Sequence, residues 1–174
     1  MKRIVLVCGL ISGAILAGMI VALIPMSSRA DFEHSELVGY ASMVLAFVMV
    51  FIGIRSYRET LGGAITFGKA FAAGILITLI ASAIYVATWE VVYFKFLPDF
   101  DQKYAAHMIT KMRASGASPA AVAAKEKEMA NLMRLYKNPL INSAMTFVEV
   151  FPVGLIVTLI SAGILRRKEQ LAPV

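Results

Sequence analysis

The stretch NPLINSAMTFVEVFPVG, residues 138–154, opens the last apolar segment of the chain and decides how that segment is placed. It contains a single carboxylate, Glu149, three residues before Pro152. The uncharged run behind Glu149, from Val150 to Leu165, has sixteen residues. As a helix this run reaches about 24 Å, which is less than a hydrocarbon core of about 30 Å. The helix therefore spans a membrane only by taking Glu149 into the membrane or its edge, where a carboxylate needs a partner or a purpose.

The composition is that of a membrane protein. Of the 174 residues, 59% are hydrophobic and 16% are charged, whereas soluble domains are nearer half apolar and a quarter charged. The net charge of +6 lies largely beside apolar runs, so it indicates topology and not nucleic-acid binding. The single cysteine, Cys8, excludes a disulfide or a cysteine metal site within one chain. We predict one membrane domain over residues 1–174.

Four apolar segments predict an all-α integral membrane bundle, with spans at about 4–25, 37–54, 68–92 and 140–165. The uncharged run from Ile4 to Met26 is longer than the apolar region of a signal peptide, so we expect a retained helix. Pro25 is expected to end that helix, and a short polar link is expected to follow. Thr66 is a plausible N-cap for the third span.

Small residues recur every four positions in three of the spans, which lets helices approach closely in lipid. The first span carries Gly9, Gly13 and Ala17; the third carries Gly74, Thr78 and Ser82; the fourth carries Gly154, Thr158 and Ala162. We favour packing inside one bundle over a dimer seam for the first set. For the sets in the third and fourth spans, we favour simple helix packing, in which the hydroxyls hydrogen-bond to the neighbouring helix or to carbonyls of their own helix. The alternative is a polar pathway lined by these residues.

Residues 98–137 form the only polar portion, and their periodicity predicts an amphipathic helical hairpin. Gly116, Ser118 and Pro119 are typical of one helix ending and another beginning. We expect the hairpin to fold back over the bundle, because two isolated short helices are marginal in water. Four methionines are expected to form an exposed seam: Met108, Met112, Met129 and Met133.

The positive-inside rule predicts that both termini and the loop 55–69 are cytoplasmic. These regions are rich in basic residues, whereas the short loop on the opposite side has one base, Arg29, and three acids. The hairpin is also basic, but the charge of a long loop has less influence on the orientation of the spans. The hairpin is then extracytoplasmic. Arg55, Arg58 and Lys69 are expected to contact anionic lipid headgroups.

A candidate polar intramembrane site comprises Glu149, Glu90, Asn142 and Pro152. Pro152 removes a backbone donor and crowds the carbonyl of Val148, which would suit an ion or proton site at a broken helix. The alternative is structural: Glu149 hydrogen-bonds a neighbouring helix or stays protonated. Glu90 is expected at the outer end of its span, facing Asn142, Ser143 or Glu149, or simply interfacial water.

Motifs for catalysis and for metal binding are absent from the sequence. There is no HExxH, no cysteine pair, no nucleophile elbow, no phosphate loop and no dinucleotide fingerprint. We therefore predict neither an enzyme nor a bound metal or cofactor.

The sequence resembles the bacterial membrane-protein family known as domain of unknown function 4199. The similar elements are GAITFGKAF (63–71), TWE (88–90), PDFDQKY (98–104), SGAS (115–118), LYKNP (135–139) and EVFPVGL (149–155). They extend over almost the whole chain. The resemblance implies a small four-span bacterial membrane protein without an assigned activity or catalytic residues, and the expected location is therefore the bacterial inner membrane.

Two main hypotheses for function follow. The first is a non-enzymatic scaffold, assembly or accessory component, whose partners are the lipid bilayer and another membrane or periplasmic protein, or a second copy of itself. The alternative is a small oligomeric transporter or proton- or ion-coupled carrier using Glu149. An enzyme acting on lipids ranks last, and nucleic acid is not an expected partner.

Overall fold

The computed structural model describes residues 1–27 and 32–167, and these ranges are helical apart from short connections. Six helices occur in them: α1 (Lys2–Ser27), α2 (Phe32–Thr60), α3 (Phe67–Phe96), α4 (Phe100–Ala114), α5 (Pro119–Tyr136) and α6 (Pro139–Leu165). Four of them, α1, α2, α3 and α6, are long and apolar enough to cross a membrane. The predicted all-helical class with four apolar spans is confirmed.

Side-chain caps begin three of the helices. Thr66 accepts a hydrogen bond from the Lys69 amide (3.4 Å), Ser118 from the Ala121 amide (3.3 Å) and Asn138 from the Leu140 amide (3.0 Å). These oxygens satisfy amides that have no partner inside the helix. The caps predicted at Thr66 and Ser118 are confirmed.

One predicted helix end in the first half was wrong. Helix α1 continues past Pro25, which was expected to end it, to Ser27. Helix α2 begins at Phe32, inside the expected polar link, whereas the candidate span within it begins at Leu37. A proline removes its own amide donor but does not prevent the residues after it from being helical. Counting apolar residues marks the part of a helix that suits lipid, not its ends. Arg29 and Asp31, from the expected acidic link, lie outside the described residues.

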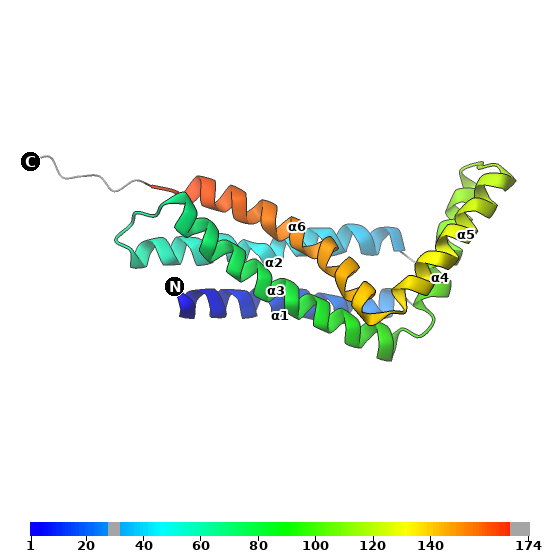
Figure 1. Ribbon diagram of the computed structural model, residues 1–174, viewed down its shortest axis with the longest axis horizontal. Coiled ribbons are helices and arrows are strands. Elements are labelled where there is room, and N and C mark those ends of the chain that lie inside the picture. The colour runs from blue at the N-terminus through cyan, green and yellow to red at the C-terminus, as the bar shows by residue number, and fades with distance from the viewer. Residues whose placement is uncertain (28–31, 168–174) are drawn as a thin grey trace, which may run out of the picture.

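The four long helices lie side by side, with α1 and α3 running in one direction and α2 and α6 in the other (Figure 1). We call the end where α1 begins and α6 ends the terminal end, and the opposite one the hairpin end. Around the bundle, α1 contacts α3, α3 contacts α6, α6 contacts α2, and α2 contacts α1. The turn between α2 and α3 lies at the terminal end, where Gly62 and Gly63 adopt positive φ angles.

Apolar side chains occur both inside and outside this bundle. The interior holds Leu16, Phe47, Ile54, Ile77 and Val150, all of them buried. The outer faces expose many large apolar side chains, including Leu10, Leu45, Val148 and Ile164. A soluble bundle would place polar residues on that outer face, so this distribution indicates helices surrounded by lipid.

Glycines allow close contact at two helix pairs. A Cβ atom placed on Gly9 would lie 2.9 Å from the Ile80 Cβ, so α1 and α3 touch there. A Cβ placed on Gly154 would overlap the Thr78 Cγ2 between α6 and α3. At the same contact the Thr78 and Thr158 hydroxyl oxygens lie 3.0 Å apart and share a hydrogen bond. The hydroxyls of α3 and α6 therefore bond across the helix contact.

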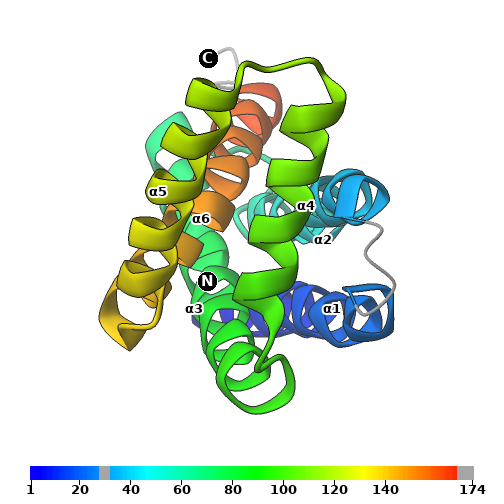
Figure 2. The ribbon, with the colours of Figure 1, turned by 90° about the vertical axis from the view of Figure 1, so that its right-hand side faces the viewer.

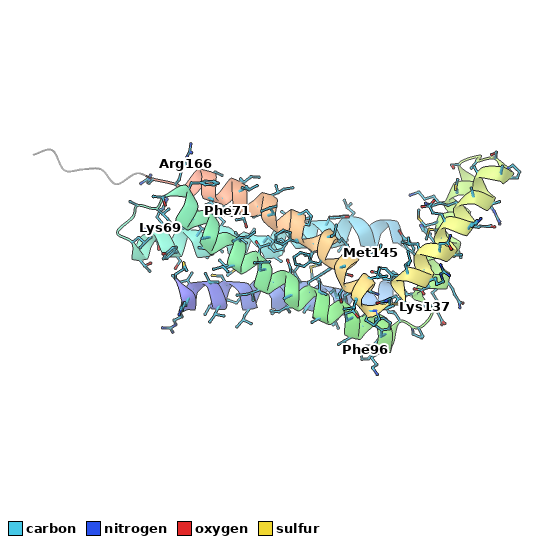
Figure 3. All side chains as sticks on the ribbon, viewed as in Figure 1. Lys69, Phe71, Phe96, Lys137, Met145 and Arg166 are labelled. Atoms are coloured by element: carbon cyan, nitrogen blue, oxygen red, sulfur yellow. The ribbon has the colours of Figure 1, made fainter. Side chains whose placement is uncertain are left out.

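The hairpin of α4 and α5 extends obliquely away from the hairpin end of the bundle (Figures 1 and 2). The hairpin was expected to fold back over the bundle, whereas it leaves the bundle at its end (Figure 1). The expected exposed methionine seam was wrong: Met129 is buried and Met108, Met112 and Met133 are half-buried. Met129 and Met133 line the groove between the two helices of the hairpin. Figure 3 labels Phe96 and Lys137 near the base of the hairpin.

Candidate polar site at the base of the hairpin

Three helices meet at the base of the hairpin and bring their polar side chains together. Helix α3 supplies Trp89 and Glu90 from its last turns, and α5 supplies Tyr136 as its final residue. Because only two residues, Lys137 and Asn138, separate α5 from α6, the chain turns sharply there and places the first turns of α6 beside Tyr136.

A continuous run of hydrogen bonds joins these helices. The Trp89 Nε1 donates to the Tyr136 Oη (3.0 Å), and the Tyr136 Oη lies 3.4 Å from the Thr146 Oγ1. The Thr146 hydroxyl donates to the Asn142 Oδ1 (3.3 Å), and the Asn142 Nδ2 donates to the Tyr136 carbonyl oxygen (3.2 Å). Since an indole nitrogen only donates, the Tyr136 hydroxyl accepts from Trp89 and gives its own hydrogen to Thr146. The bonds thus run in one direction from Trp89 back to the backbone of residue 136.

Burial makes this run of hydrogen bonds important for stability. Asn142 is 0% exposed and Thr146 is 2% exposed. A buried polar group left without a partner costs about 1–3 kcal/mol, so each member depends on the next. The arrangement fixes the end of α5 against α3 and α6 and holds the hairpin at its base.

Two acidic side chains make further links at this base. The Ser143 hydroxyl donates to the Glu90 Oε1 (2.9 Å), joining α6 to α3. The Tyr93 hydroxyl donates to the Asp101 Oδ1 (2.5 Å), joining α3 to α4. Ser143 was one of the three residues that Glu90 was expected to face.

Aromatic rings surround the same region. The Tyr93 and Tyr136 rings meet edge to face with centroids 5.2 Å apart, and the Trp89 and Phe100 rings do so at 5.5 Å. Such pairs add about 0.5–1.5 kcal/mol beyond their burial. Aromatic side chains with polar tips suit the boundary between lipid and water, which agrees with an interfacial position for the hairpin base.

The Tyr136 hydroxyl remains protonated at neutral pH. Burial raises the pKa of Tyr136 above its ordinary value, and the negative charges of Glu149 and Glu90 raise it further. The hydrogen bonds with Thr146 and Trp89 act in the opposite direction but do not cancel these effects. Tyr136 is therefore a hydrogen-bond donor in this site, consistent with the direction of the bonds.

Glu149 and Pro152 lie elsewhere on α6. Both are exposed and belong to an outward-facing stripe that also includes Val148 and Ile156. Glu149 lies ten residues beyond Pro139, which is about 15 Å along the helix. Helix α6 continues through Pro152, so the expected break beside Glu149 is not present. Of the four predicted site residues, Glu90 and Asn142 come to the hairpin base, whereas Glu149 and Pro152 are exposed on α6, although the charge of Glu149 still acts on Tyr136.

The three bases expected to contact lipid occupy different environments at the terminal end. The Arg55 Nε bonds the Glu59 Oε1 at 3.2 Å within α2. The Arg58 Nε is buried without a hydrogen-bond partner in the described part of the chain. Lys69 lines a pocket together with Arg166 and Arg167.

Sequence reasoning missed most of the hydrogen-bonded site. Trp89, Tyr136 and Thr146 were not among the predicted site residues. Trp89 and Tyr136 are 47 positions apart in the sequence, and no signal in the sequence shows that these two side chains meet. The turn at Asn138–Pro139 was the available clue, because a short connection places the residues on either side of it close together.

The structure defines a class: a helical protein with four candidate membrane spans and a hairpin between the third and fourth. Residues 7–167 match the family described as "Protein of unknown function (DUF4199)", and the chain belongs to that family. The resemblance seen in the sequence is thereby confirmed. Neither the curated proteins nor the solved structures include a match to the chain.

Proposed function

We propose that the protein is a non-enzymatic scaffold, assembly or accessory component of a bacterial inner membrane, and that its hairpin is the docking element. The observation that carries this proposal is the groove between α4 and α5, which has a volume of about 600 Å³ on a hairpin that extends beyond the bundle. Hydrogen bonds hold the hairpin at its base, and the groove between α4 and α5 is open to a partner. This arrangement is typical of a docking surface and not of a lid that covers a binding site.

The groove combines an apolar floor with charges of both signs. Ala105, Ile109 and Met129 line it, and an ion pair between the Arg113 Nη2 and the Glu126 Oε1 (2.9 Å) crosses it between α4 and α5. Further lining residues carry charge: Asp101, Arg134 and Lys137. An amphipathic helix of a partner, with apolar residues on one face and both charges beside them, matches this lining.

Charge distribution supports an extracytoplasmic position for the hairpin. Bases flank the spans at the terminal end, which the positive-inside rule places in the cytoplasm with both termini. The hairpin then meets a periplasmic protein, the outer part of another membrane protein, or a second copy of this chain.

Paired substitutions on α5 test the proposal. Ala130 lines the groove, whereas Ala124 is exposed on the same helix outside it. Tagged full-length protein carrying Ala130→Arg should lose co-purifying protein in mild detergent, whereas wild type and Ala124→Arg should retain the same partner. Circular dichroism checks that both variants stay helical. A wild-type protein that is a lone monomer after crosslinking, or a partner retained equally by both variants, would contradict the proposal.

A second candidate function is an oligomeric carrier that uses Glu149. The supporting observation is an acidic side chain exposed on the otherwise apolar outward stripe of α6, at a depth where a carboxylate is costly. Since Glu149 is exposed on α6, a path through it would lie between copies. Proteoliposomes containing wild type or Glu149→Gln are compared for proton and cation flux at two pH values. Equal flux from both proteins would exclude a role for Glu149 in movement of those ions.

A further inference from the structure

The terminal end of the bundle contains a second pocket, of about 910 Å³. Ile65, Thr66, Phe67 and Lys69 line one side of it, and Arg166 and Arg167 line the other. Figure 3 shows Lys69 and Arg166 at this end, on α3 and just after α6. The pocket thus joins the beginning of one span to the end of another.

The backbone holds the two sides of the pocket together. The Ile65 amide donates to the Arg167 carbonyl oxygen (3.1 Å), and the Arg167 amide donates to the Ile65 carbonyl oxygen (3.0 Å). This pair of bonds fixes the chain after α6 against the turn before α3. The bases of the two segments are therefore kept near each other by the fold.

The pocket is strongly positive. Of the lining residues in the described part of the chain, three are basic and none is acidic. The first turn of α3, capped by Thr66, contributes the positive end of a helix dipole, and the last turn of α6 contributes a negative end, so the net positive charge of the pocket comes from the basic side chains. Arg55, at the same end of the bundle, differs because Glu59 already neutralises it.

The pocket also lies at the level of lipid headgroups. It forms where the apolar helices α3 and α6 begin and end, and Phe67 stacks on Phe71 with ring centroids 6.1 Å apart beside it. Phospholipid phosphates lie at this level, and basic pockets between spans bind multiply charged lipid headgroups.

We propose that this pocket binds the headgroup of an anionic phospholipid that carries two phosphates, of the cardiolipin type. One phosphodiester would neutralise one of the three cations, whereas two phosphates in one headgroup neutralise two of them. The apolar lining at Ile65 and Phe67 suits the glycerol and the first acyl carbons next to the phosphates. The site is independent of any partner of the hairpin, at the opposite end of the bundle.

The test measures lipid retention by purified full-length protein, by native mass spectrometry from mild detergent. The added lipids are cardiolipin, phosphatidylglycerol at the same phosphate concentration, and phosphatidylcholine, and inorganic phosphate serves as a competitor. The variants are the triple substitution Lys69→Gln, Arg166→Gln and Arg167→Gln, the single Lys69→Gln, and the control Arg55→Gln. Because the measurement uses purified protein, altered membrane topology in cells does not affect it.

Wild type and Arg55→Gln should retain cardiolipin in preference to the other two lipids. A basic residue near an anionic headgroup contributes about a fivefold gain in affinity, so Lys69→Gln should weaken retention about fivefold and the triple variant roughly 100-fold. Equal retention by the triple variant and wild type would overturn the site, as would equal loss in Arg55→Gln. Equal retention of phosphatidylglycerol would overturn the preference for two phosphates. Displacement by millimolar inorganic phosphate would identify a free-phosphate site instead. Helicity by circular dichroism separates loss of binding from loss of fold.

Discussion

Replacing Gly154 with alanine should destabilise the bundle, although alanine is the better helix former. Gly154 is buried where α6 crosses α3 and α2. A Cβ at this position would overlap the Thr78 Cγ2 and would lie 2.8 Å from the Phe47 Cζ. Carbon atoms in contact are ordinarily about 3.5–4.0 Å apart, so α6 must move or its neighbours must repack.

Three contributions determine how much Gly154→Ala changes the free energy of unfolding. Forcing one methyl group into a packed core costs about 1–3 kcal/mol. Moving Thr78 also weakens its hydrogen bond with Thr158, and such bonds between spans average about 0.6 kcal/mol. Alanine in a helix is more stable than glycine by about 0.5–1 kcal/mol, which offsets part of this loss of stability. Gly154→Ala should therefore lower the free energy of unfolding by about 2 kcal/mol.

Gly163 supplies a matched control in the same helix. No atom of the described chain lies within 4 Å of a Cβ built there, so Gly163→Ala should stabilise by about 0.5–1 kcal/mol. Equilibrium unfolding in dodecyl sulfate, followed by circular dichroism, measures both variants. Combining Gly154→Ala with Thr78→Ser removes the overlapping Cγ2 and should recover part of the loss. Equal stability of the two alanine variants, or no recovery in the double variant, would refute the close contact of α3 and α6.

Three further predictions concern the hairpin and its base. Because burial raises the pKa of Tyr136, its stabilising effect is complete below the unfolded-state pKa of about 10 and is lost as pH rises through the folded-state pKa. Tyr136→Phe should thus reduce the loss of thermal stability between pH 8 and pH 11; an identical loss would contradict the buried hydroxyl. Asn142→Ala should lower the free energy of unfolding by about 1–3 kcal/mol, and Ser143→Ala should lower it by at most about 1 kcal/mol. Unfolding is followed by the fluorescence of the single tryptophan, and a larger loss in Ser143→Ala would contradict the role of the buried Asn142 amide. Ser118→Ala should speed hydrogen exchange in the first turn of α5 by removing a cap worth about 1 kcal/mol, without moving the unfolding midpoint of the spans; unchanged exchange would show that the cap contributes little.

The sequence by itself determined the elements of this fold. Four apolar runs, separated by charged or polar connections, specify four spans because lipid accepts few other structures. The starts at Thr66, Ser118 and Asn138 were also readable, since capping depends on one side chain and the amides that follow it. The ends of α1 and α2 were not, because polar residues can continue a helix beyond the lipid.

Only the tertiary structure decided which faces meet. In a soluble helix an apolar stripe identifies the buried side, but these spans are apolar on all sides, so Phe47 inside and Val148 outside look equivalent in the sequence. For the same reason the outward position of Glu149 could not be predicted from its neighbours along the chain. The contact of Trp89 with Tyr136, and the joining of Lys69 to Arg167 around one pocket, depend on segments far apart in sequence. Such contacts follow from how whole helices pack, which no local pattern of residues encodes.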